Sequence, residues 1–119
     1  MIKKILCAII ISGILVNTCS CALLQKTMDR RTGFSDQLKQ TENFIRNEEW
    51  NKAKVSLEES KKTWKKLKPL LQIDIDHDYV NSIEEDFVKL DAFIDTEAKA
   101  DSLSTILLVE DDWKNIGSL

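Results

Sequence analysis

Few residues in this sequence can break a helix. Its 119 residues include one Pro, Pro69, and three Gly, of which only Gly33 and Gly117 come after Leu24. Because Gly and Pro most strongly interrupt regular structure, their scarcity predicts long helices joined by few turns. The one run that alternates apolar and polar residues, at positions 73–76, is too short to indicate a strand.

From residue 25 onward the chain also lacks thiols and excess positive charge. All three Cys lie before that point, at Cys7, Cys19 and Cys21. The remainder therefore has no disulfide, no thiolate nucleophile and no Cys metal site, and it can fold in an oxidising compartment. Without Lys3 and Lys4, the 17 Lys and Arg become 15 against 20 Asp and Glu, a net charge of −5. A nucleic-acid-binding protein needs a basic face, so we expect no nucleic-acid partner.

The longest uncharged run extends from Ile5 to Leu24, directly after Lys3 and Lys4. A helix needs about 20 residues to cross the ~30 Å hydrocarbon core of a bilayer, and this run has 20. We therefore expect residues 1–24 to be a signal anchor or transmembrane helix that binds the membrane through residues 5–24. Residues 25–119 would then form one domain, because a chain of this length buries a single modest core.

Two other fates of the leader stay open. Cleavage after Ala22 would release a secreted form, since Ser20 and Ala22 are small residues at the usual positions. Lipidation of Cys19 or Cys21 would give a lipoprotein, although neither Cys follows the usual Leu and two small residues. An uncut anchor needs no special cleavage residues and fits the run best.

Charges around the leader leave its orientation undecided, because Lys3 and Lys4 precede it and Lys26, Arg30 and Arg31 follow it. The short N-terminal flank favours an inside N-terminus. We therefore expect a single-pass protein of the cell membrane with its domain outside the cytoplasm.

Apolar spacing predicts the helices of this domain. The first follows a register of three and four residues from Leu24 to Ile45, with Gly33 as a kink and Ser35 or Asp36 as an alternative helix cap. The second has the longest stripe: Trp50, Ala53, Leu57, Ser60, Trp64, Leu67 and Leu71. Because Pro69 disfavours helical geometry at the residue before it, we expect this helix to end or kink at Lys68.

Two further helices are predicted, at about 78–94 and about 97–115. The third carries Val80, Ile83, Phe87, Leu90 and Ile94 on one face. The fourth carries Leu103, Ile106, Leu107, Val109, Trp113 and Ile116. These patterns predict an all-α protein: an N-terminal transmembrane helix followed by a small three- to four-helix bundle or helical hairpin array. Trp50, Trp64 and Trp113 each fall on an apolar stripe, so we expect them to anchor the core.

An acidic run between the second and third helices resembles a calcium loop in part. Its oxygen-bearing residues fall at loop positions 1, 3, 5, 9 and 12: Asp74, Asp76, Asp78, Ser82 and Glu85. Tyr79, however, stands where the sharp turn requires Gly, and Asn81 stands where an apolar residue is usual. We therefore interpret Asp76 or Asp78 as a helix cap and expect no metal or cofactor.

His77 is the only His in the chain. A catalytic His needs a nucleophile or an orienting partner, and a single His among acids cannot build a His-rich metal site. We expect it to donate a hydrogen bond between helices. No nucleophile paired with a base is evident elsewhere, so we expect no enzymatic activity.

Several of these residues also form a pattern shared with a known family. They are Trp50-Asn51-Lys52-Ala53-Lys54, then Trp64, then Ile75-Asp76-His77 followed by Ile83-Glu84. Over about residues 40–110 the chain resembles a bacterial family of membrane-anchored helical proteins, domain of unknown function family 4363. Its members often continue to an Asn-Ile-Leu end, whereas this chain stops soon after Asn115-Ile116. The resemblance implies a membrane-anchored helical protein and no known activity.

These observations favour a non-enzymatic protein-interaction module of the bacterial cell envelope. Its partner would be a membrane or envelope protein, or a second copy of the chain, bound through helix faces. The alternative is an extracytoplasmic domain that senses a cation or small ligand with the acids at Asp74–Asp78.

Overall fold

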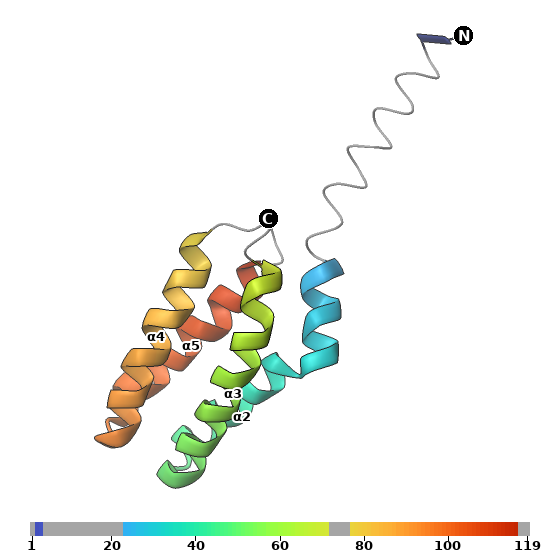
Figure 1. Cartoon of the computed structure of the whole chain (residues 1–119). Coiled ribbons are helices and arrows are strands. Elements are labelled where there is room, and N and C mark those ends of the chain that lie inside the picture. Colours follow the sequence, from blue (N-terminus) through green and yellow to red (C-terminus); the bar gives the residue numbers. More distant parts are fainter. Residues whose placement is uncertain (1, 4–22, 72–76, 117–119) are drawn as a thin grey trace.

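The computed structural model of the chain describes residues 2–3, 23–71 and 77–116. Within these ranges the regular structure is helical, with no strand. A helical stretch at residues 23–32 precedes four longer helices (Figure 1), which are α2 (Phe34–Arg46), α3 (Trp50–Leu71), α4 (His77–Asp95) and α5 (Lys99–Ile116). The prediction of an all-α domain is confirmed for the described part of the chain.

The four helices form an antiparallel bundle in which each helix packs mainly against two neighbours (Figure 1). α2 packs on α3, α3 on α4, α4 on α5, and α5 closes the bundle on α2. Residues 47–49 connect α2 to α3, and residues 96–98 connect α4 to α5. Connections this short favour antiparallel packing of the joined helices. We call α2 and α3 the first hairpin, and α4 and α5 the second hairpin.

The second hairpin repeats the first at a constant offset along the sequence. In both connections a Glu has a positive φ, 56° at Glu48 and 55° at Glu97. The next residue donates its N–H to the carbonyl of Phe44 (2.9 Å) or Phe93 (2.8 Å), so both turns are Schellman motifs. The buried pairs at the same offset are Phe34 and Ile83, Leu38 and Phe87, Thr41 and Leu90, Ile45 and Ile94, Ala53 and Ser102, Ser56 and Thr105, Leu57 and Ile106, Ser60 and Val109, Trp64 and Trp113, and Leu67 and Ile116. Each position in one hairpin can therefore be compared with its counterpart in the other.

Gly33 breaks the first predicted helix into two. Its φ of 68° lies in the left-handed region, which residues other than Gly adopt at a cost. Asp29 stabilises the break, because its Oδ1 accepts the Ser35 N–H at 2.8 Å. The predicted kink at Gly33 is confirmed, and Ser35 and Asp36 lie in the first turn of α2 rather than at its cap.

Of the two outcomes predicted at Lys68, an end of the helix is wrong, and a kink stays a prediction. α3 continues to Leu71 with Pro69 inside it. The missing Pro N–H affects only the last turn, where Leu67 and Leu71 are both buried in the core. Burial of these two side chains offsets the local cost of the Pro.

Two details of the fourth helix also differ from the prediction. The helix begins at Lys99 rather than Glu97, because Glu97 adopts the left-handed turn conformation. Leu107, placed on the apolar face by its spacing, is 41% exposed.

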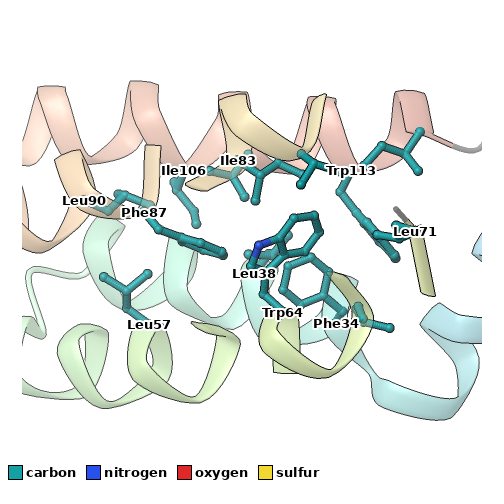
Figure 2. Close-up of a cluster of buried hydrophobic side chains, with 14 of the residues drawn as sticks. Phe34, Leu38, Leu57, Trp64, Leu71, Ile83, Phe87, Leu90, Ile106 and Trp113 are labelled. Atoms are coloured by element: carbon teal, nitrogen blue, oxygen red, sulfur yellow. The ribbon is translucent and has the colours of Figure 1, made fainter. Parts of the chain in front are cut away.

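The centre of the core is a cluster of four aromatic rings (Figure 2). The centroid of Phe34 lies 5.8 Å from that of Trp64 and 4.9 Å from that of Trp113. Phe87 meets Phe34 and Trp64 edge-on, at 6.5 Å from each. Because each of the four helices contributes one ring, this cluster joins the two hairpins.

Across residues 23–71 and 77–116, no helix is long and apolar enough to cross a bilayer. Apart from positions 23 and 24, the predicted span at residues 5–24 lies outside the described residues.

Candidate functional site

The residues that the sequence singled out lie mainly in the core. Ala53, Trp64, Ile83, Phe87 and Trp113 are buried, and Trp50 packs half-buried against the same core. Their positions support a role in holding the bundle together.

The acidic run is placed only in part. Asp74 and Asp76 lie outside the described residues, whereas Asp78 and Glu85 are exposed on α4. No group of three or more metal-ligating side chains occurs in the described ranges. His77 is the exposed first residue of α4, and its role as a donor between helices stays a prediction.

A concave feature that the sequence did not suggest lies between residues 23–32, α2 and α5. It is a cavity of about 560 Å³. Its lining combines apolar and charged side chains: Gln25, Asp29, Ser35, Asp36, Leu38, Lys39, Leu107, Glu110, Asp111, Trp113 and Lys114. We refer to it below as the α2–α5 cavity.

Trp113 connects the three walls of the α2–α5 cavity. Its Nε1 donates a hydrogen bond to Ser35 Oγ at 3.0 Å, which joins α5 to α2. Its carbonyl accepts a hydrogen bond from Gln25 Nε2 at 3.4 Å, which joins α5 to residues 23–32. The Trp113 side chain is buried, so core packing holds this wall in place.

A pair of carboxyl groups lies where α2 meets α5. Glu42, on α2, is only 2% exposed. It accepts hydrogen bonds from Lys39 Nζ (2.5 Å) and Arg46 Nε (2.7 Å), one on each oxygen. Glu110, on α5 and on the cavity wall, hydrogen-bonds to Glu42, and its Oε1 is buried with no partner among the described residues.

The two carboxyl groups differ strongly in acidity. Burial raises the pKa of Glu110, and the hydrogen bond to Glu42 and the negative charge of Glu42 raise it further, to about 7. Burial also raises the pKa of Glu42, but hydrogen bonds from Lys39, Arg46 and Glu110 outweigh this effect and lower it below the usual value. At neutral pH the pair therefore consists of a charged Glu42 and a partly protonated Glu110 that donates to it.

The sequence reasoning missed this pair. Glu42 lies beside the apolar stripe of Leu38 and Ile45, and Glu110 follows Val109, so both resemble ordinary helix-surface acids. A signal was present in the hairpin repeat, which aligns Glu110 with Lys61 and so reverses the charge at that position.

Comparison with known proteins gives a family match. The model of a family described as Domain of unknown function (DUF4363) matches residues 22–118. The match confirms the family that the sequence pattern indicated and extends the similarity beyond residues 40–110. No curated protein and no solved structure matches the chain.

Proposed function

The chain belongs to the DUF4363 family, whose description states no activity, and from its structure we propose that it is a non-enzymatic protein-interaction module of the cell envelope. Residues 5–24 would hold it at the membrane, and the α2–α5 cavity would receive the partner.

The α2–α5 cavity is the observation that carries this proposal. Leu38 and Leu107 provide apolar lining, and the partial exposure of Leu107 makes it accessible to a partner. Asp36, Lys39 and Asp111 provide charged groups on the same lining. Protein-binding surfaces likewise combine apolar and polar groups.

The position of the α2–α5 cavity in the chain indicates the kind of partner. Gln25, which lines it, directly follows the uncharged run that ends at Leu24. If residues 5–24 cross the bilayer, the cavity lies close to the membrane surface. A segment of another membrane protein, next to the same surface, is therefore the occupant that we propose.

The anchor predicts an uncut leader. We expect the chain purified from membranes to keep residues 1–24, because an uncut anchor holds residues 5–24 in the bilayer. Intact-mass spectrometry measures this directly. A mature form that starts at Leu23, or a lipid on Cys19 or Cys21, would contradict the anchor.

The partner site predicts where crosslinks form. A photo-crosslinking residue at Leu107 should capture one membrane or envelope protein in intact membranes, because this side chain is exposed at the α2–α5 cavity. Val88 on α4 is a matched control, since it is also an exposed aliphatic residue, at 71%, and does not line the cavity. Mass spectrometry identifies the product. No product at Leu107, or the same product at Val88, would refute this site.

A further inference from the structure

The two interfaces between the hairpins use different chemistry at equivalent positions. At the constant offset between the two hairpins, the counterpart of Lys61 is Glu110 and the counterpart of Glu42 is Asp91. In the α3–α4 interface a cation faces an anion, with Lys61 Nζ 2.7 Å from Asp91 Oδ2. At the equivalent position in the α2–α5 interface, the carboxyl group of Glu110 instead faces the carboxyl group of Glu42. Such a pair is held together while one member keeps its proton, because two adjacent carboxylates repel each other.

The Trp contacts across the two interfaces show the same contrast. Trp64 Nε1 donates to Glu84 Oε1 at 3.3 Å, and Lys68 pairs with Glu84 at 2.6 Å, so the α3–α4 interface has a second ion pair. The equivalent bond in the α2–α5 interface runs from Trp113 Nε1 to the neutral Ser35 hydroxyl. The charge of Glu110 therefore has more influence on how α2 and α5 hold together.

Charged groups on the elements around Glu110 have opposing effects on its pKa. From α2, Glu42 favours the protonated form of Glu110, whereas Lys39 and Arg46 favour the ionised form. Other charged groups line the cavity on residues 23–32, α2 and α5: Asp29, Asp36, Asp111 and Lys114. On α4, which also packs against α5, the buried Asp86 is already paired with Lys89 at 2.8 Å.

We propose that the α2–α5 interface is a proton-dependent latch on the α2–α5 cavity, closed while Glu110 carries a proton and open once the proton leaves. This inference rests on the proposed function, because the cavity is where we place the partner. Opening moves Glu110 away from Glu42 and widens the wall between α2 and α5.

The direction of the effect follows from the acidity of Glu110. Burial and Glu42 raise its pKa in the folded chain to about 7, from a usual value of 4.5. Its proton therefore stabilises the closed form fully at pH values below that usual value, and this contribution is lost as the pH rises through about 7. Glu42 has a lowered pKa and stays ionised between these two values.

The two equivalent Trp indoles provide the test. In the full chain, NMR measures the hydrogen–deuterium exchange of the Trp113 indole N–H, with the Trp64 indole N–H as an internal reference. Both side chains are 2% exposed and both N–H groups donate across an interface, so chemical effects of pH on exchange cancel in the ratio. We expect the ratio of Trp113 to Trp64 exchange to rise about tenfold or more between about pH 5.5 and about pH 8.

The Glu110→Gln variant tests whether ionisation of Glu110 causes the rise in the exchange ratio. Gln keeps a donor for Glu42 and cannot ionise. The ratio of Trp113 to Trp64 exchange in this variant should therefore stay, at every pH, at the low value that the wild type has in acid. Glu85→Gln, at an exposed position on α4, and His77→Gln, which removes the only imidazole, should both keep the wild-type rise.

Three results would overturn the latch: a flat ratio in the wild type, an unchanged rise in Glu110→Gln, or loss of the rise in His77→Gln. These readouts need no partner. Failure of the latch and failure of the Leu107 crosslink are therefore separate results.

Discussion

Trp64→Ala is expected to leave the bundle largely or partly unfolded. Removing a buried Trp side chain costs about 3–5 kcal/mol of unfolding free energy. A domain of this size has only about 5–15 kcal/mol in total. One substitution on α3 would therefore remove a large share of the stability of the whole bundle.

Contacts with three other helices explain the size of this effect. The Trp64 ring lies 5.8 Å from Phe34 on α2, 6.5 Å from Phe87 on α4 and 6.4 Å from Trp113 on α5, centroid to centroid. An Ala at this position leaves a void next to all three rings, and a close-packed core collapses only partly around such a void.

Circular dichroism melting of the full chain, with and without the substitution, measures this effect. Val88→Ala is the control, because Val88 is exposed and its truncation should change the melting temperature little. An unchanged melting curve for Trp64→Ala would contradict the core position and would make the face around Trp64 a candidate partner surface.

Most of the bundle could be predicted because its helices are strongly periodic. The stripe from Trp50 to Leu71 appears as α3 with the same limits, and Gly33 interrupts the first helix as its backbone freedom suggests. The error at Pro69 has a physical reason. A local rule about the residue before Pro competed with burial of the end of α3 in the core, and burial determined the outcome.

The carboxyl pair could not be predicted in the same way, because it depends on which helices are neighbours. Glu42 and Glu110 belong to different hairpins, and spacing along one helix gives no information about contacts with another. The repeat of Trp64 at Trp113 was a clue that the second hairpin repeats the first. The repeat is hard to see in the sequence, because the two hairpins mostly share buried positions rather than identical residues. The burial that shifts the pKa of Glu110 arises only when α5 closes on α2.

Phe34→Ala is expected to match Trp64→Ala in effect, with a loss of about 3–5 kcal/mol in unfolding free energy. Phe34 is fully buried at the start of α2, and its ring contacts Trp64, Phe87 and Trp113. Its truncation would therefore loosen the first hairpin from the second at the centre of the core. Urea unfolding at one pH measures the loss as a lower midpoint.

Phe34→Leu separates the volume of this ring from its aromatic character. Leu keeps an apolar side chain at the start of α2, so this variant should lose much less stability than Phe34→Ala. Part of its smaller loss is the aromatic contact itself, since such ring pairs contribute about 0.5–1.5 kcal/mol beyond buried area. Equal urea midpoints for Phe34→Ala and Phe34→Leu would show that the volume of this ring does not hold the two hairpins together.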